Sequence, residues 1–419
     1  MPYKVIVAHP GRQHSYRLAT ALYKADMLSS YVTTIYDKPT SRSMQLVKCA
    51  LNEDGRKRAS GRRMKEVPDE KVVQYGVFRG YTEALLNRID KSRYFCRALH
   101  RQNADYFGER VARLAIETNA DAVVLYDTNA RRCFEILAEK APQIKRIMDI
   151  SSACRHYRKK IYEHEIVASG HDDLRRENKY MWDKQIMDKY LREIQVTQYF
   201  LAGSEFVKKS LIDCGVASEN IIILPYGANV SSDIVRGEFS AGNKLHFLFV
   251  GVANYNKGVS TLIDAISKIP ADKADLTIVG AFDRKAWFVE EGRKHSNITF
   301  TGHVTIDQMK AIYEKADVFV IDSFAEGMAQ VGIEAMACGL PIICSFNSGL
   351  SEAVRDGESG YVIPCGDVPA LRDKLQWFID HPERIRAMGN AARETAQDYT
   401  WERYEENAAK IISSIIADK

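Results

Sequence analysis

Residues 322–344 constrain the fold of this chain more than any other segment. A strand-like apolar run, Asp317–Ile321, precedes them, and a second run, Pro341–Cys344, closes them. Between the two runs, a short loop that carries Glu326 leads into a helix-like stretch that carries Glu334. Strand, tight loop, helix and strand in this order make one βαβ unit, so the two strands are expected to lie parallel in a sheet.

The same segment places two carboxylates eight positions apart. The loop would bring Glu326 and the backbone amides of residues 327–330 to the N-terminus of the helix. Unsatisfied amides and the helix dipole stabilise an anionic phosphate at such a position. Glu334 follows about two turns later, at ~1.5 Å per residue, so it can reach another part of the same extended ligand.

Strand-like and helix-like runs alternate in both halves of the chain. A chain of 419 residues is too long for one ordinary core, so we expect two domains. Strand-like runs lie at residues 4–8, 121–126, 145–150, 199–203 and 221–225 and, after a polar linker at 230–244, at 245–250, 275–279, 298–300, 317–321 and 341–344. This pattern predicts two doubly wound parallel sheets that face a cleft, with the ligand outside the carboxyl ends of the strands.

Composition excludes several classes of protein. Hydrophobic residues make up 46% and charged residues 27%, and the net charge is +4, so composition does not indicate a nucleic-acid binder. The eight cysteines include no CxxC pair, which argues against a zinc site and a disulfide framework and fits a reducing cytosol. The first apolar run is too short for a signal peptide, and no run of 18 apolar residues predicts a transmembrane helix.

Two further loops carry candidate phosphate ligands. Gly251–Gly258 follows a strand and opens a helix, so its glycines would let the backbone approach a phosphate while Lys257 supplies a point charge. The spacing is not that of a Walker A loop, and an ordinary turn with a surface lysine is the alternative. In the matching loop of the first half, Gly11 could approach the ligand and His14 could donate to a phosphate or sugar hydroxyl, although an isolated histidine more often caps or packs.

These segments together resemble glycosyltransferase family 4. The resemblance rests on Phe249–Gly251 with Lys257 and Gly258, on Gly302–Val304, on Asp317–Ile321 and on Glu326–Pro341. Residues 203–229 resemble the domain junction of that family, and residues 401–419 resemble its helix that crosses back to the first domain. The resemblance spans most of the chain and is strongest in residues 199–365.

The resemblance implies an α/β protein of GT-B architecture, with two Rossmann-like domains facing a central cleft. It implies an acceptor-binding domain at residues 1–228, a nucleotide-sugar-binding domain at 229–396 and a helix at 397–419 that packs back on the first domain. The implied activity is that of a retaining hexosyltransferase. It would move a sugar from a UDP- or GDP-sugar to a saccharide or lipid-linked acceptor, in cell-surface polysaccharide or glycolipid synthesis.

The resemblance also assigns roles by position. Glu326 would bind hydroxyls of the donor sugar, Lys257 would neutralise the leaving diphosphate, and His14 would act from the first-half loop, which makes these three the implied catalytic residues. The implied donor-binding residues are Gly11, Arg12, Gly251, Gly302, His303, Val304, Gly327, Met328, Ala329, Gln330 and Glu334. Glu334 would hold the ribose. No metal or other cofactor is implied, because fixed positive groups would stabilise the charge that builds on the diphosphate.

Four departures from the family pattern affect these roles. Val252 stands where the family often has a phosphate-binding arginine, and Arg12 and Lys285 are the candidate replacements. Ser151 stands where the family has a second histidine; His156 is a candidate substitute or a helix-surface residue. The first-half loop reads His9-Pro10-Gly11 instead of two adjacent glycines, and residues 328–330 replace a common Phe-Gly. Two other functions therefore stay open: a nucleotide-sugar 2-epimerase-like enzyme and a non-catalytic, glycosyltransferase-like partner protein.

A basic stretch lies in the first half of the chain. Residues 40–65 contain eight basic and two acidic side chains, a net charge of +6, and residues 75–107 are rich in arginine and aromatic residues. Such a surface could lie on an anionic bilayer, where each basic group contributes about 1 kcal/mol. A solvated charged loop, or binding of a phosphate-bearing acceptor, would account for the same charges. We expect a cytoplasmic protein, either free or peripheral on the inner face of the membrane; the sequence does not indicate its oligomeric state.

Overall fold

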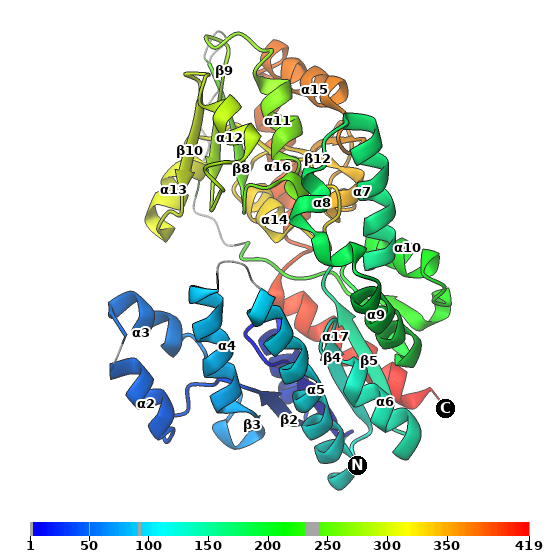
Figure 1. Ribbon diagram of the computed structural model, residues 1–419. Coiled ribbons are helices and arrows are strands. Elements are labelled where there is room, and N and C mark those ends of the chain that lie inside the picture. Colours follow the sequence, from blue (N-terminus) through cyan, green and yellow to red (C-terminus); the bar gives the residue numbers. More distant parts are fainter. Residues whose placement is uncertain (1–2, 50, 91–93, 231–233, 235–243, 419) are drawn as a thin grey trace.

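The chain forms two domains, each built on a parallel sheet (Figure 1). The computed structural model describes residues 3–49, 51–90, 94–230, 234 and 244–418. Most of the linker expected at residues 230–244 therefore lies outside the described residues. Both sheets are doubly wound, with helices on both faces, which confirms the GT-B architecture expected from the sequence.

The first sheet has seven strands in the order β3-β2-β1-β4-β5-β6-β7. Their bounds are β1 Val5–Ala8, β2 Leu28–Thr33, β3 Val72–Gln74, β4 Ala122–Tyr126, β5 Lys145–Ile150, β6 Tyr199–Ala202 and β7 Ile221–Ile223. The central strands are continuous apolar runs because helices cover them on both faces, and every residue of β1 and β4 is buried. Parallel pairing of β4 with β5 sets Tyr126 opposite Asp149 at the carboxyl edge.

Helices of the first half surround this sheet. Their bounds are α1 Ser15–Lys24, α2 Arg42–Cys49, α3 Glu53–Ser60, α4 Val77–Ile89, α5 Tyr94–Glu117, α6 Arg131–Lys140, α7 Arg155–Ser169, α8 Asp173–Glu177, α9 Lys184–Val196 and α10 Glu205–Asp213. The basic stretch at residues 40–65 thus includes two short helices instead of an open loop. Ser204 begins α10 as a side-chain cap, because its hydroxyl accepts the amide of Val207.

The second sheet has six strands in the order β10-β9-β8-β11-β12-β13. Its strands are β8 Leu245–Val250, β9 Ala274–Val279, β10 Ile298–Gly302, β11 Val318–Ile321, β12 Ile342–Ser345 and β13 Gly360–Ile363. Its helices are α11 Val259–Ile266, α12 Trp287–Gly292, α13 Ile306–Lys315, α14 Gln330–Ala337, α15 Val368–Asp380 and α16 Arg384–Ala396. The βαβ unit predicted at residues 317–344 is therefore β11, α14 and β12, and it is confirmed.

The C-terminal helix, α17 (Trp401–Ala417), returns to the first domain (Figure 1). It packs on α1 with a buried face that includes Ala408, Ile412 and Ile415. The carboxylate of Glu405, which is 7% exposed, pairs with Lys24 at 2.7 Å and with Arg17 at 3.3 Å. These contacts confirm the helix that was expected to cross back.

The segment α7–α8 joins the two domains, and Figure 1 shows it beside the second sheet. A hydrophobic cluster combines Tyr162 and Leu174 of this segment with Phe324 and Ala325 of the second domain. The domains therefore share part of their buried surface, and the cluster lies next to the loop that carries Glu326.

One expectation about the cysteines is wrong. Cys154, just before α7, and Cys214, just after α10, form a disulfide. Their separation of 60 residues carries no local signature, and only the approach of the two helix ends brings them together. His156 lies beside them, so that the three potential ligand atoms are within 4.8 Å of one another. The two thiols could serve a metal only if the disulfide were reduced.

Candidate active site

The loop after β8 is shaped by backbone packing at the carboxyl edge of the second sheet. Gly258 has φ +68°, and a side chain there would collide with the carbonyl of Asp322, at the end of β11. Asn254 accepts the amide of Lys257 at 2.9 Å and closes the turn before α11. These contacts bring Lys257 of one loop beside the Glu326 loop that follows β11.

Lys257 and Glu326 form an ion pair. Both side chains are 22% exposed, so the pair is largely removed from water. Burial lowers the pKa of Lys257 to about 8, and the nearby Arg158 guanidinium acts in the same direction. The sequence predicted that these two residues act at one site, and the structure brings them together.

Arg158 belongs to α7 and reaches this site from the first half of the chain. Its guanidinium donates to the hydroxyl of Tyr162 at 3.1 Å and to that of Ser152 at 3.2 Å. Tyr162 in turn donates to Asn256, the residue before Lys257. Glu177 of α8 accepts the amides of Tyr255 and Asn256 at 3.0 and 3.3 Å. The α7–α8 segment thus holds the Lys257 loop and adds a second cation beside it.

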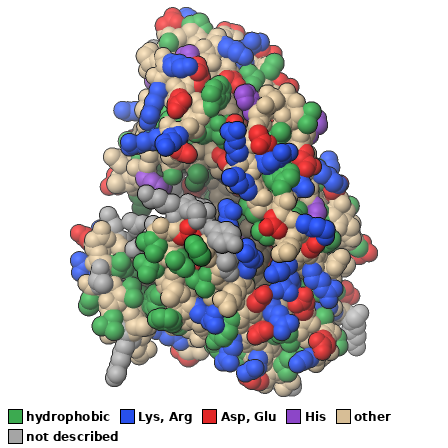
Figure 2. Space-filling model, viewed as in Figure 1, with side chains coloured by type: hydrophobic (Ala, Val, Ile, Leu, Met, Phe, Trp, Pro, Cys, Tyr) green, Lys and Arg blue, Asp and Glu red, His purple; other side chains and the backbone are tan. Residues whose placement is uncertain are grey.

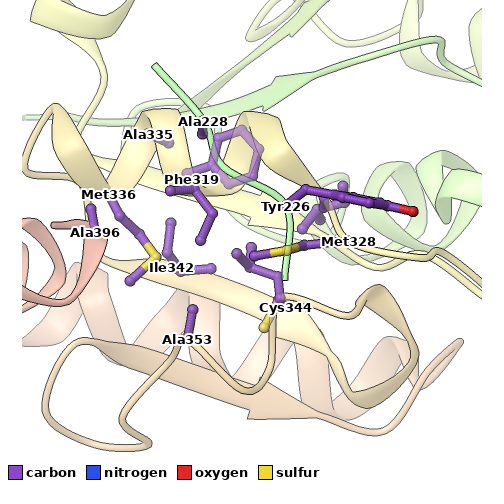
Figure 3. Close-up of a cluster of buried hydrophobic side chains, with 14 of the residues drawn as sticks. Tyr226, Ala228, Phe319, Met328, Ala335, Met336, Ile342, Cys344, Ala353 and Ala396 are labelled. Atoms are coloured by element: carbon purple, nitrogen blue, oxygen red, sulfur yellow. The ribbon is translucent and has the colours of Figure 1, made fainter. Parts of the chain in front are cut away.

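The turn after Glu326 packs tightly against the first domain. A side chain at Gly327 would collide with the carbonyl of Ser151, and the Gly327 carbonyl accepts the Ser204 hydroxyl at 2.7 Å. Figure 3 shows the Met328 side chain within a buried cluster that also contains Tyr226 and Cys344. Met328 and Ala329 are both buried, so a ligand could meet these residues chiefly through backbone atoms.

The backbone amides of residues 327–329 have no hydrogen-bond acceptor among the described residues. They precede α14, which begins at Gln330. The Gln330 amide itself donates to the Met328 carbonyl at 3.0 Å. The N-terminus of α14 therefore lies next to Glu326, as the sequence predicted, but of the amides of residues 327–330 that of Gln330 is already engaged.

Gln330 and Glu334 contact the domain junction. The Gln330 side chain donates to the carbonyl of Gly227 at 2.7 Å. Glu334, half-buried in the second turn of α14, accepts the backbone amide of Asn229, and burial raises its pKa. Both residues are therefore placed where the two domains meet.

On the facing edge of the first sheet, His14 forms part of a buried polar cluster. Its Nε2 lies 3.1 Å from Asp149 Oδ2, and Tyr226 donates to the other oxygen of Asp149 at 2.8 Å. The rings of Tyr126 and Tyr226 lie 5.1 and 4.2 Å from the His14 ring. Asp149 is 1% exposed, so these two donors satisfy a carboxylate that is cut off from water.

The rest of the first-half loop is also ordered by a histidine. His9 Nδ1 lies 3.0 Å from the Gly11 amide and 2.9 Å from the Gly11 carbonyl, so it accepts from the first or donates to the second according to its tautomer. Burial lowers the pKa of His9 to about 4, so its ring is neutral near pH 7. Gly11 lines a cavity with Ser151, whereas Arg12 lines a separate cavity that also contains Gln330 and Asn229.

Several predicted residues lie away from the Lys257–Glu326 pair. Gly302 ends β10 and His303 and Val304 follow it, at the far end of the same carboxyl edge. The Gly302 carbonyl accepts the Gly280 amide there at 2.9 Å. Gly251 lies between these residues and Lys257 along that edge.

The candidate replacements also occupy different places. Lys285 shares a cavity with Val252. His156 stacks on Tyr190, with ring centroids 6.3 Å apart, as a half-buried residue of α7.

Four residues of this region were not identified from the sequence: Asp149, Tyr226, Arg158 and Tyr162. Asp149 near the end of β5 and Tyr226 just after β7 carried a usable signal, because polar residues at the carboxyl ends of parallel strands gather at one edge. Arg158 and Tyr162 carried none, since their place depends on how α7 packs against the other domain.

The comparisons agree with this arrangement. The structure matches a sucrose-phosphate synthase from Thermosynechococcus elongatus with a TM-score of 0.62, 17% identity and complete coverage of both chains. It also matches Anabaena HepE in complex with UDP, with a TM-score of 0.61 and 14% identity over 98% of this chain and 100% of that one. These likenesses define the fold class as GT-B.

The family follows from the sequence of the second domain. Residues 231–395 match the model described as "Glycosyl transferases group 1", so this domain belongs to that family. A glycogen synthase of Mycobacterium tuberculosis is 28% identical over 211 residues, which are 46% of this chain and 51% of that enzyme. The chain thus spans about half the length of this curated relative.

Proposed function

We propose that the chain is a retaining glycosyltransferase that takes its sugar from a nucleotide-diphosphate donor. The observation that carries the proposal is the Lys257–Glu326 pair, which lies beside the amides of residues 327–329 in a group 1 domain. Support for a nucleotide donor comes from HepE, a structural neighbour solved with UDP and with UDP-glucose. UDP- and GDP-sugars are both candidate donors.

In this proposal the donor diphosphate replaces Glu326 as the partner of Lys257. Freed from the ion pair, Glu326 binds hydroxyls of the donor sugar, while the amides of residues 327–329 contact the sugar and the phosphates. Glu334 holds the ribose, and the backbone of Gly302, His303 and Val304 lies against the base. Gly251 leaves room for the backbone to approach the phosphates.

Arg158 supplies the positive charge of the phosphate-binding arginine that the family often has at the position of Val252. Burial is the main cause of the lowered pKa of Lys257, and Arg158 is the cation that adds to it. The hydrogen bonds of Arg158 go to two neutral hydroxyls. As the anomeric carbon–oxygen bond breaks, its electron pair passes to the diphosphate. Lys257, Arg158 and the N-terminus of α14 stabilise that charge, so the proposed reaction requires no divalent metal.

The acceptor is proposed to bind in the first domain, near Gly11 and His14. Retention requires the acceptor oxygen to bond on the face from which the diphosphate departs. The acceptor proton then passes to the departing phosphate oxygen, so that charge and atoms balance. His14, which is held by its hydrogen bond to Asp149, orients the acceptor at the carboxyl edge of the first sheet. Glycogen synthase as a relative supports a saccharide acceptor.

The proposal includes contact with a membrane surface through α4 instead of through the basic stretch at residues 40–65. Three of the basic residues in 40–65 are already paired, Lys48 with Asp37, Lys57 with Glu53 and Arg63 with Asp69. Support for a lipid-linked acceptor comes instead from α4, whose Phe78, Leu85 and Ile89 are 79, 58 and 63% exposed. No helix in the described part of the chain is long and apolar enough to cross a membrane.

The test is donor turnover with a panel of UDP- and GDP-sugars. Release of the nucleoside diphosphate is the measured quantity. We expect slow hydrolysis of one donor and protection against thermal unfolding by its nucleotide. Glu326→Ala should abolish hydrolysis, whereas Glu139→Ala, an exposed carboxylate of α6, should not. Donor that changes configuration without releasing sugar would indicate an epimerase instead. Absence of both nucleotide protection and hydrolysis would favour a non-catalytic partner protein.

A further inference from the structure

A groove lies in the first domain beside the carboxyl edge of its sheet. It consists of two cavities of about 500 and 380 Å³. The residues that line both cavities are Glu83, Asn87, His100, Ala104, Thr128 and Asn129. Because they share these lining residues, the two cavities adjoin each other along α4 and α5, and together they are called the groove.

The inner end of the groove reaches the candidate active site. His9, Gly11 and Ser151 line that end. The Ser151 backbone lies directly against Gly327, the residue after Glu326. A molecule in the groove would therefore have one end beside the proposed donor site.

Positive charge lines the groove from end to end. Arg62, Arg79 and Arg155 are half-buried, and Arg97, Arg101 and Lys189 are exposed. Among the residues that the structure describes, none of these six cations has a carboxylate within ion-pair distance. A partly desolvated guanidinium without a carboxylate is costly, so a ligand is the partner that would offset the cost.

Three of the guanidiniums lie over aromatic rings, Arg97 at 5.9 Å from the centroid of Tyr180 and the other two at shorter distances. Arg79 lies 4.7 Å from the centroid of Tyr106 and donates to Asn103 at 3.4 Å. Arg155 lies 4.8 Å from the centroid of Tyr190 and 5.1 Å from that of Tyr180. Contact with a ring limits the motion of the guanidinium and leaves N–H groups at its edge free to bind an oxyanion in bidentate fashion.

The carboxylates of the groove are already engaged. Glu83 accepts from His100 at 2.7 Å and from Asn103 at 2.8 Å, and Asp105 pairs with Arg131. Glu193 accepts three backbone amides, those of residues 128, 130 and 131. Asp127, the fourth carboxylate of the groove, accepts the Ser151 hydroxyl at 3.0 Å. Among the described residues, eight arginine and lysine side chains line the two cavities against four carboxylates, so the groove has an excess of positive charge.

We propose that this groove binds an anionic group of the acceptor, a phosphate or carboxylate carried on a saccharide, through Arg79 and Arg155. This rests on the proposed transferase function and names the class of its acceptor. Arg79 lines the inner cavity and Arg155 the outer one, so the anion is proposed to lie between them, with the saccharide extending inward to Ser151 and the donor loop. The anionic group can belong to a free sugar or to a lipid-linked one, because α4 lines the groove with Arg79, Glu83 and Asn87 and exposes Phe78 and Leu85 elsewhere on the same helix.

The first experiment is calorimetry with glucose 6-phosphate, with glucose as the neutral control, at saturating UDP so that the donor site is occupied. We expect glucose 6-phosphate alone to bind, and Arg79→Gln and Arg155→Gln each to weaken it by about tenfold or more, since a charge-assisted bidentate contact is lost. Arg113→Gln is the matched control, because Arg113 is an exposed guanidinium of α5 that does not line the groove. Binding that survives both groove substitutions, or no binding of the phosphate at all, overturns the proposal.

A measurement without substitutions covers the case in which a variant does not fold. The wild-type chain is treated with an arginine-selective dicarbonyl, and the modified positions are mapped by mass spectrometry. Glucose 6-phosphate should protect Arg79 and Arg155 and leave Arg113 unprotected. Equal modification with and without the phosphate contradicts the proposal. Loss of UDP binding with intact phosphate protection would instead contradict the donor-site assignment alone.

Vesicles of phosphatidylcholine that contain a polyprenyl phosphate decide whether the anionic group belongs to a free saccharide or to a lipid-linked one. If the acceptor is lipid-linked, Arg79→Gln and Phe78→Ser should both reduce sedimentation with these vesicles, while Phe78→Ser leaves glucose 6-phosphate binding unchanged. Equal sedimentation with and without the polyprenyl phosphate identifies a free anionic saccharide. Vesicle binding that requires the polyprenyl phosphate but is unchanged by Arg79→Gln and Arg155→Gln overturns the groove as the anion site.

Discussion

The carboxyl edges of the two sheets both gather polar residues, but they hold charge in different ways. In the second domain, Lys257 is paired with Glu326, and both are carried by loops of one sheet. In the first domain, Asp149 is satisfied by His14 and Tyr226, whereas the groove arginines rest on aromatic rings without a carboxylate. In the proposed function, Lys257 at the edge of the second sheet exchanges Glu326 for the donor diphosphate. The groove arginines of the first domain have no carboxylate to exchange, and their proposed partner is the anion of the acceptor.

The largest expected effect is at Lys257. Lys257→Ala should lower kcat by about 10²–10³-fold, because a fixed positive group at the departing diphosphate is lost. The rate of donor turnover measures this effect, with Lys140→Ala, an exposed lysine of α6, as the control. A rise in KM with kcat unchanged would mean that Lys257 only binds the donor and takes no part in the chemical step.

Tyr226→Phe tests the buried cluster of the first edge. It removes one of the two side-chain donors to Asp149, so the free energy of unfolding should fall by about 1–3 kcal/mol. Urea denaturation measures the change. Tyr23→Phe, at a half-buried tyrosine of α1, is the control and should leave stability nearly unchanged. Equal stability of Tyr226→Phe and wild type would show that Asp149 does not depend on this donor.

The pH dependence of nucleotide binding tests whether the charge of Lys257 holds the donor at the edge of the second sheet. Lys257 has a pKa lowered to about 8, so its charge is present below that pH and is lost as the pH rises through it. The affinity for UDP should therefore fall by about tenfold between pH 7 and pH 9. Calorimetry at several pH values measures this fall. The same fall in Lys257→Met would assign the titration to another group.

The smallest effect concerns the helix that closes the first domain. Glu405→Gln should lower the free energy of unfolding by about 1 kcal/mol, since charge-assisted contacts with Lys24 and Arg17 are weakened. Glu406→Gln, at the exposed neighbouring position, is the control. If both substitutions behave alike in urea denaturation, the contact of α17 with the first domain does not depend on this ion pair.

Much of the second domain could be predicted because its information is local. Apolar runs buried on both faces identify β8, β9, β11 and β12, and the Gly251–Gly258 and 322–344 segments carry their loop chemistry within a few residues. Three strands were missed, β2, β3 and β13. The first contains two serines, the second has three residues, and the third begins with a glycine at the sheet edge. None of these has the continuous apolar pattern that reveals a buried strand.

By itself the sequence determined two parallel-sheet domains, the loop that carries Glu326, the helix α14 that carries Glu334, and the lysine beside them, Lys257. These features follow from spacing, because period and turn chemistry act over a few residues. Only the tertiary structure decided that Arg158 lies beside Lys257, that Tyr226 and His14 share Asp149, that Cys154 meets Cys214, and that Arg79 and Arg155 face one groove. Each of these contacts joins residues that are distant in the chain or depends on how whole helices pack, which no local pattern encodes.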